Sequence, residues 1–323
     1  MSLAEFALID RIRARSRARD DVVLGIGDDA ALLQPAIGHW LAVTADTLNS
    51  GVHFPPETLP EDIGWKALAV NLSDLAAMGA TPVWGTLALS LPEAEAPWID
   101  AFADGFFELA DAHGWQLIGG DTTRGPLSLS VTAFGQVPYG QALRRDGAQV
   151  GDDIWVSGTL GDAAGALWLW REGGLDVTRA AQDDGMEYLR QRLLRPTPRV
   201  TLGHALRGVA NAAVDISDGL LADLGHVAAR SGVRAQVWSD ALPISPALAH
   251  LLGNDVARDC SVQGGDDYEL CFTAPAHHRD TLHALALGVS IKCIGRVVEG
   301  SGVYCDGYDG LRGYQHFGDD DAG

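Results

Sequence analysis

Gly119-Gly120-Asp121-Thr122-Thr123-Arg124-Gly125 follows the apolar pair Leu117–Ile118, and this stretch is the strongest local signal in the chain. The apolar pair indicates a strand that leads into a glycine-rich turn. Paired glycines let a backbone approach a phosphate closely, and the aspartate offers a hard oxygen ligand that suits Mg²⁺. Arg124 is a candidate for contact with an anion. The stretch therefore predicts a strand whose end carries a metal and a phosphate.

Six further aspartates lie in glycine-rich or hydroxyl-rich segments, most of them directly after an apolar run. Carboxylates at the ends of buried strands are favourable only where a cation neutralises them. Several hard oxygen ligands together suit Mg²⁺ that carries a polyphosphate. These aspartates are Asp28 in 25–29, Asp46 in 43–47, Asp74 in 71–74, Asp215 and Asp218 in 215–219, and Asp266 in 264–269.

Each of these aspartates also has an ordinary structural alternative, because aspartate forms turns and caps helices. Asp28 is expected to be a ligand, since Asp29, followed by Ala30-Ala31-Leu32, is the better candidate for a helix cap. Asp46 is expected at the end of a strand. A role in a turn and a role as a metal ligand remain equally open for it.

Asp74 lies near the C-terminal end of an apolar helix predicted over 60–78, with Asn71 on the same face. The helix macrodipole disfavours an acid there, and a metal would offset that cost. Asp215 and Asp218 flank a strand-to-helix turn from which both can face one metal. Ser217 would present a hydroxyl or N–H group at the start of that helix. A helix cap would explain Asp218 alone.

The composition excludes several classes of protein. The 323 residues suffice for two domains, and a net charge of −20 argues against a broad nucleic-acid-binding surface. No apolar stretch is long enough to cross a membrane. Four cysteines without a C-x-x-C pair predict free thiols in a cytoplasmic protein. P-loop, protein-kinase and zinc-protease motifs are absent, so metals would neutralise most of the charge of a nucleotide.

Apolar periodicity predicts alternating strands and helices, which indicates an α/β fold. A shift in composition at Pro138–Asp152 predicts two domains, 1–138 and 139–323. Gly158–Asp162 resembles a phosphate loop, but a tight turn is the better interpretation of a lone glycine pattern. The predicted strands are 22–26, 41–45, 83–91, 127–136, 154–157, 270–273 and 291–297, and the predicted helices include 60–78, 98–113, 163–170 and 220–231.

Together, these motifs resemble the thiamine-monophosphate kinase family, and they occur in the order of that family. The wider superfamily includes aminoimidazole ribonucleotide synthetase, selenophosphate synthetase and a hydrogenase maturation protein. The Leu117–Gly125 and Tyr268-Glu269-Leu270 versions are similar to the thiamine enzyme. The resemblance extends from Gly25 to Phe317.

The resemblance implies two α/β domains, with an N-terminal sheet that pairs with a second subunit in a barrel-like dimer core. The N-terminal domain would bind ATP and metal, and the C-terminal domain would complete the active site. The implied reaction passes the γ-phosphoryl group of ATP in line to thiamine monophosphate, which gives thiamine diphosphate and ADP. Several Mg²⁺ ions held by aspartates would neutralise the two anions and align them.

The resemblance also implies roles for single residues. Ala45 stands where the family usually has a hydroxyl residue, so only its carbonyl group would contribute, and Asp266 replaces the usual glutamate. Asp28, Asp74, Asp121 and Asp215 would be catalytic. The implied metal ligands are Asp28, Thr44, Ala45, Asp46, Asp74, Asp121, Asp215 and Asp218; the nucleotide contacts are Gly120, Asp121, Arg145 and Ser217; the substrate contacts are His53, Asp266 and Phe317.

Three other functions remain open at this point. Besides a thiamine-monophosphate kinase, they are another ATP-using member of the superfamily, a nucleotide-binding maturation partner without small-molecule turnover, and a phosphohydrolase. Because the acceptor phosphate is already ionised near neutral pH, a kinase of this kind needs no strong general base.

Overall fold

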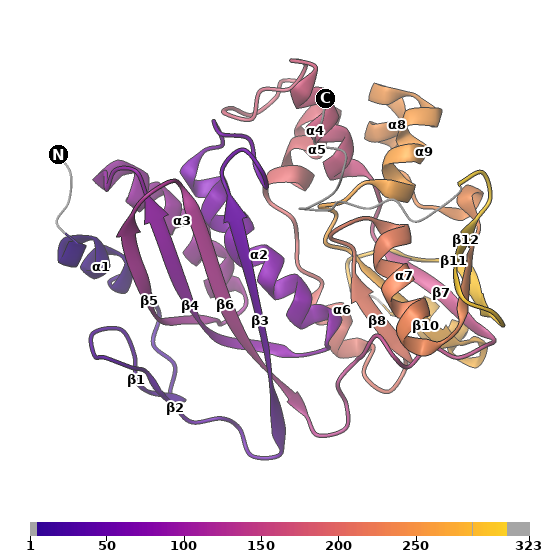
Figure 1. The fold of residues 1–323 in the computed structure, drawn as a ribbon, viewed down its shortest axis with the longest axis horizontal. Coiled ribbons are helices and arrows are strands. Elements are labelled where there is room, and N and C mark those ends of the chain that lie inside the picture. The colour runs from indigo at the N-terminus through magenta and orange to yellow at the C-terminus, as the bar shows by residue number, and fades with distance from the viewer. Residues whose placement is uncertain (1–4, 286, 309–323) are drawn as a thin grey trace. The chain divides into compact units, whose positions relative to one another are not determined.

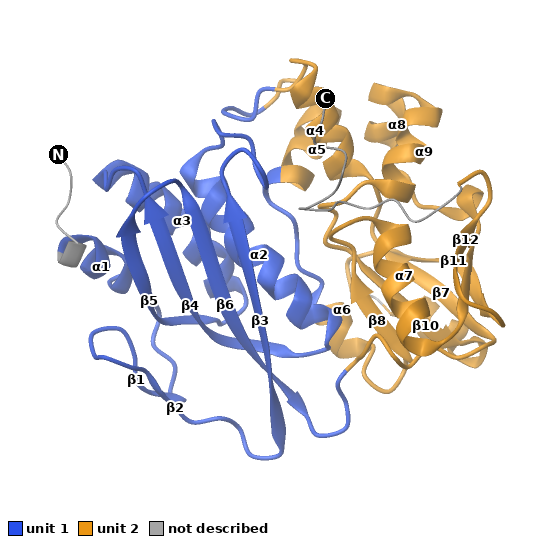
Figure 2. Ribbon diagram, in the orientation of Figure 1, with its two compact units in different colours: residues 1–142, 176–180, 194–200 blue, residues 143–175, 181–193, 201–323 orange. Residues whose placement is uncertain are grey.

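The computed structural model describes residues 5–285 and 287–308, which form two compact units (Figures 1 and 2). Unit 1 comprises residues 1–142, 176–180 and 194–200, and unit 2 comprises residues 143–175, 181–193 and 201–323. No helix in the described part of the chain combines the length and the apolarity that a bilayer span requires. Its four cysteines are free, as the sequence predicted.

Unit 1 is built around a four-stranded sheet in the order β3-β6-β4-β5. The β4–β5 pair is parallel, and the other pairs are antiparallel. Helix α2 covers one face of the sheet, and α3 packs against α2 (Figure 1). The elements are α1 (Glu5–Arg13), β1 (Val22–Leu24), β2 (Leu32–Leu33), β3 (His39–Asn49), α2 (Pro60–Ala77), β4 (Thr81–Leu91), α3 (Ala96–Ala112), β5 (Gln116–Arg124) and β6 (Ser128–Pro138).

Helix α2 is apolar almost all round, which explains its burial between the sheet and α3. Pro60 opens its first turn, and Gly79, with a φ of 63°, allows the chain to leave the helix. The opposite face of the sheet carries no helix in the described residues (Figure 1). There the side chains of Leu41 and Val43 are 46% and 58% exposed.

Unit 2 contains a six-stranded sheet in the order β12-β9-β11-β7-β10-β8, in which only the β12–β9 pair is parallel. Helix α7 places Leu220, Leu224 and Val227 in the core of this unit. Further elements are β7 (Asp152–Ser157), α4 (Asp162–Arg171), α5 (Asp184–Leu194), α6 (Val200–Ala205), β8 (Ala212–Asp215), α7 (Leu220–Ser231), β9 (Arg234–Val237), α8 (Pro246–Leu252), α9 (Asn254–Gln263), β10 (Leu270–Pro275), α10 (Arg279–His283), β11 (Ile291–Val298) and β12 (Gly302–Cys305).

The long elements match the sequence predictions, but two predicted turns do not exist. The segment Gly119-Gly120-Asp121 lies inside β5, because β4 pairs with it in parallel as far as Arg124. Asp46 also lies inside a strand, since β3 continues to Asn49 against β6. Both sites therefore sit on the sheet itself rather than on loops beyond it.

Candidate active site

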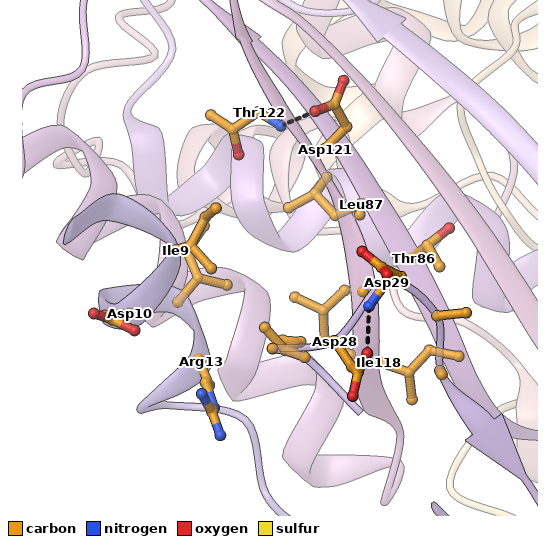
Figure 3. A pocket seen from close by; sticks show the side chains of 18 residues that line it. Ile9, Asp10, Arg13, Asp28, Asp29, Thr86, Leu87, Ile118, Asp121 and Thr122 are labelled. Atoms are coloured by element: carbon orange, nitrogen blue, oxygen red, sulfur yellow. Dashed lines mark hydrogen bonds between the residues drawn. The ribbon is translucent and has the colours of Figure 1, made fainter. Parts of the chain in front are cut away.

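A pocket of about 780 Å³ lies in unit 1 between α1, β4, β5 and residues 26–31 (Figure 3). Asp28, Gly120 and Asp121, all predicted site residues, line this pocket. Its volume is within the roughly 300–1,000 Å³ that is usual for small-molecule sites. The pocket is therefore large enough for a substantial part of a nucleotide.

The two predicted carboxylates of the pocket are exposed, and each accepts one hydrogen bond from the next residue in the chain. Asp28 Oδ1 accepts the N–H of Asp29 at 2.9 Å, and Asp121 Oδ1 accepts the N–H of Thr122 at 2.9 Å. Figure 3 shows the two carboxylates at separate places along the pocket. No helix follows Asp29, since the chain enters β2 there, so the alternative of a helix cap is wrong.

Gly120 has a structural reason to be glycine. A Cβ atom at this position would lie 1.9 Å from the carbonyl oxygen of Leu87 on β4. At Gly119 the nearest atom to such a Cβ is 4.0 Å away. The close approach of β4 and β5 therefore demands only the second glycine, and it leaves the backbone of Gly120 open to the pocket.

A second group of predicted ligands lies between β3 and α2. The Thr44 hydroxyl donates to Asp74 Oδ2, and the Asp46 N–H donates to Asn71 Oδ1 at 3.2 Å. Burial and the neighbouring charge of Asp74 raise the pKa of Asp46 to about 7. Two carboxyl groups that disfavour each other's charge in this way lie where a cation would neutralise both, so these residues fit a divalent metal.

The two groups of carboxylates lie at opposite edges of one sheet. Asp46 is on β3, Asp121 is on β5, and strands β6 and β4 separate them. In the described part of the chain, no three acidic, histidine or cysteine side chains gather closely enough to hold a metal by themselves. The predicted ligands of unit 1 thus form two half-sites.

The remaining predicted residues of unit 1 have different surroundings. His53 Nδ1 accepts the N–H of Asn49 at the end of β3, which leaves Nε2 as the protonated nitrogen of the neutral ring. Ala45 is exposed and points away from α2, on the opposite face of β3 from Thr44. Phe317, the third predicted substrate contact, lies outside the described residues.

Unit 2 brings its own predicted residues together. Asp215 is the buried last residue of β8 and pairs with Leu270 of β10. The Asp266 N–H donates to the Ser217 carbonyl oxygen at 2.9 Å, so segment 264–269 is attached to the turn 215–219. Tyr268 OH donates to Asp266 Oδ1 at 3.0 Å and orients that carboxylate. These contacts bring Asp215, Asp218 and Asp266 into one region of unit 2.

Asp223 organises the turn 215–219, and the motifs did not reveal it. Its Oδ2 accepts the N–H groups of Ser217, Asp218 and Gly219 at 3.0, 3.0 and 3.1 Å. Burial, and then the charge of Asp218, raise the pKa of Asp223 to about 7. Asp223 thus fixes the turn, and the alternative of Asp218 as a helix cap is wrong. The signal for Asp223 in the sequence is an acidic residue in the first turn of the helix that became α7.

These bonds also limit what the predicted nucleotide contacts can do. The Ser217 N–H is already donated to Asp223, so a contact with a nucleotide at Ser217 would use the hydroxyl group. Arg145 is exposed, and its carbonyl oxygen accepts from the Ser231 hydroxyl at 3.0 Å. The neighbouring Arg144 forms an ion pair with Asp146.

Known proteins are similar to nearly the whole chain. The family described as AIR synthase related protein matches residues 27–137 with its N-terminal domain and residues 149–306 with its C-terminal domain. Thiamine-monophosphate kinase of Salmonella typhimurium is 48% identical over 327 residues, which cover 98% of this chain and 99% of the relative.

Solved structures agree with this similarity. The crystal structure of thiamine-monophosphate kinase from Stenotrophomonas maltophilia K279a has a TM-score of 0.90 at 71% identity, over 95% of this chain and 98% of that chain. AaThiL complexed with AMPPCP and TMP has a TM-score of 0.79 at 34% identity, over 98% of this chain and 99% of that chain. The chain therefore belongs to the thiamine-monophosphate kinase family of AIR synthase related proteins.

Proposed function

We propose that this protein transfers the γ-phosphoryl group of ATP to thiamine monophosphate in the cytoplasm, giving thiamine diphosphate and ADP by direct in-line transfer. The observation that carries this proposal is full-length similarity to thiamine-monophosphate kinases, at 48% identity over 98% of the chain. AaThiL, which is similar over 98% of this chain, binds AMPPCP and TMP. The two half-sites of unit 1 and the carboxylate-rich turn of unit 2 suit a reaction between two anions.

Mg²⁺ fits the carboxylates of these sites, because they are hard oxygen ligands and the Asp74 charge next to the buried Asp46 favours a neutralising cation. Bound there, it would neutralise the phosphates of both substrates. The residues that would hold it are Asp28, Thr44, the Ala45 carbonyl group, Asp46, Asp74, Asp121, Asp215 and Asp218.

The protein's own groups would bind and orient the substrates. Gly120, the Ser217 hydroxyl and Arg145 would contact the nucleotide, Gly120 through its backbone and Arg145 through its exposed guanidinium group. His53, Asp266 and Phe317 would contact thiamine monophosphate. Because the acceptor oxygen is ionised near neutral pH, none of these residues has to remove a proton.

The activity is tested by the formation of thiamine diphosphate and ADP from MgATP and thiamine monophosphate. We expect equal amounts of both products and little reaction with free thiamine, which lacks the phosphate that the metals would contact. Release of inorganic phosphate without thiamine diphosphate would indicate a phosphohydrolase. ATP binding without any turnover would indicate a maturation partner.

We further propose a homodimer formed through the face of the unit 1 sheet that carries no helix in the described part of the chain, with the two sheets completing a barrel-like core. Two observations support it: Leu41 and Val43 are exposed on this face, and the sheet carries predicted ligands at both of its edges, Asp46 on β3 and Asp121 on β5. Two-fold pairing is an arrangement in which the β5 edge of one protomer can approach the β3 edge of its partner.

Mixing of inactive variants tests this arrangement. Asp121→Asn disables the β5 edge, and Asp74→Asn disables the β3 edge. If one site uses both edges from different protomers, a refolded equal mixture regains about a quarter of the wild-type activity, because half of the dimers carry one intact site. A monomer by light scattering, or a mixture as inactive as its parents, would contradict the proposal.

Finally, we propose that the carboxylates of both units serve the same reaction. Asp74→Asn and Asp215→Asn keep the side-chain shape and remove one charge each. Each change should lower turnover by about 10²–10³-fold. Their combination should cost much less than the product of the two effects, since groups that act as a unit are not additive. Two strictly multiplicative effects would argue for separate roles.

A further inference from the structure

A buried ionic cluster in unit 2 has no part in the roles assigned above. Its centre is Arg192 on α5, whose side chain is only 10% exposed. Arg192 Nη2 lies 3.0 Å from Glu269 Oε1, and its Nε lies 3.6 Å from Asp162 Oδ2. The Asp162 and Glu269 carboxylates are fully buried. A buried guanidinium group of this kind is costly unless its partners are fixed around it.

Neighbouring hydroxyl groups fix the two carboxylates. Asp162 accepts from Thr159 and Ser245, and Tyr188 OH donates to its Oδ2 at 3.0 Å. Glu269 accepts from the Ser157 hydroxyl. The cluster therefore joins β7, the start of α4, α5 and the beginning of β10 into one rigid group of contacts.

The segment 264–269, which carries Asp266, passes through this cluster in an unusual backbone conformation. Asp266 has a φ of 68° and Tyr268 a φ of 51°, both in the left-handed region. Side chains other than glycine are disfavoured there, and such residues persist only where the surroundings hold them.

The Arg192 side chain forms a direct hydrogen bond to this backbone. The carbonyl oxygen of Asp267, between the two left-handed residues, accepts from Arg192 Nη2 at 3.2 Å. On the other side, Asp267 Oδ2 accepts the Gly161 N–H at 2.7 Å. This bond uses an N–H that a phosphate loop at 158–162 would need, so that segment is part of the cluster. The tight turn is the interpretation that the contacts support.

We propose that Arg192 is a positioning residue for substrate binding: it holds segment 264–269 so that the Asp266 carboxylate faces thiamine monophosphate. Arg192 does not touch the substrate. It acts through the Asp267 carbonyl group, and the left-handed backbone on either side turns Asp266 toward Ser217 and Tyr268. The inference rests on the proposed role of Asp266 in this reaction.

Three variants test the proposal in the full-length protein. Arg192→Gln removes the charge, and Arg192→Lys keeps it while losing the planar fork. Arg190→Gln is the matched control, because Arg190 lies on the same helix, is buried, and pairs with Glu187 at 2.8 Å outside the cluster. The control measures the general cost of removing a buried arginine from α5.

Two measurements separate positioning from simple stabilisation. The first is amide hydrogen exchange of peptides that cover 264–270, which does not depend on any activity. The second is the KM for thiamine monophosphate compared with the KM for ATP. For Arg192→Gln we expect about tenfold faster exchange in this segment and about a tenfold higher KM for thiamine monophosphate, as for groups coupled through one network, with less than a twofold change for ATP. Arg192→Lys should lie between Arg192→Gln and the wild type.

Two outcomes would overturn the proposal. One is exchange in 264–270 that stays at the wild-type rate or rises no more than in the rest of unit 2. The other is an equal change in KM for Arg190→Gln. If the wild type forms no thiamine diphosphate, the proposed function fails, whereas the exchange data still decide whether Arg192 holds the segment.

Discussion

The tripeptide Gly-Gly-Asp occurs twice in this chain and has two different structures. In residues 119–121 it is part of strand β5, and the Asp121 carboxylate is exposed in a pocket with one local hydrogen bond. Residues 264–266 form a loop before β10. There the backbone of Asp266 is in the left-handed region, and Asp266 forms hydrogen bonds with Ser217 and Tyr268. The same tripeptide thus positions its carboxylate through strand pairing in unit 1 and through tertiary contacts in unit 2.

The difference shows which part of each segment is constrained. In the first, a neighbouring strand requires one glycine, Gly120, while Gly119 has space around it. In the second, both glycines are enclosed, since a Cβ on Gly264 or Gly265 would lie 2.4 Å from a backbone oxygen. The first carboxylate is therefore free to bind a ligand but is weakly oriented, and the second is oriented before any ligand arrives.

The largest expected effect is on kcat, and it distinguishes the proposed roles of Asp121 and Asp266. Asp121→Asn should lower kcat by about 10²–10³-fold, as when one group that stabilises the transition state is lost. Its melting temperature should stay unchanged because Asp121 is exposed and makes only a local bond. Asp266→Asn should mainly raise the KM for thiamine monophosphate. Steady-state kinetics of both variants check this, and a larger fall of kcat in Asp266→Asn would reverse the assignment.

Gly265→Ala tests whether the second segment depends on its contact with turn 215–219. The new Cβ would lie 2.4 Å from the Ser217 carbonyl oxygen, so the two backbones must separate. We expect a loss of about 1–3 kcal/mol in the free energy of unfolding, as for other overpacked sites. The KM for thiamine monophosphate should rise in the same variant. Chemical denaturation and kinetics on one preparation show whether the two effects occur together.

Gly120→Ala and Gly119→Ala form a matched pair in the first segment. Alanine at 120 would meet the Leu87 carbonyl oxygen at 1.9 Å, and alanine at 119 meets nothing closer than 4.0 Å. We expect the first change to lower the free energy of unfolding by about 1–3 kcal/mol and the second to change it by no more than about 0.5 kcal/mol. Equal losses at both positions would contradict a requirement for glycine at position 120 alone.

The sequence predicts the long elements of this fold because their apolar patterns are strong and local. The helix over 60–78 and the strand over 83–91 are found within a few residues as α2 and β4. Short elements such as β9 and β12 escape prediction, since four residues carry too little periodicity to identify a strand.

The motifs single out a set of acidic residues but do not predict their surroundings. Glycine beside aspartate predicts a turn, yet Gly120 lies in β5 because β4 pairs with it, and no local pattern contains that information. Asp223 and Arg192 were missed for the same reason: their importance comes from partners distant in the chain or from N–H groups that only the folded turn presents. The assigned roles of the acidic residues remain predictions until the variants are measured.

The smallest expected effect concerns the hydroxyl group that orients Asp266. Tyr268→Phe removes the bond of 3.0 Å to Asp266 Oδ1 and keeps the ring, which is 7% exposed. A typical hydrogen bond contributes about 0.5–1.5 kcal/mol net, and Asp266 keeps its backbone contact with Ser217. We therefore expect the KM for thiamine monophosphate to rise by a few-fold, with kcat and the melting temperature close to the wild type. If Tyr268→Phe adds nothing in an Asp266→Asn background, the hydroxyl acts through Asp266. An undiminished effect in that background would mean that Tyr268 contacts the substrate itself, and that the second segment is less pre-oriented than its contacts indicate.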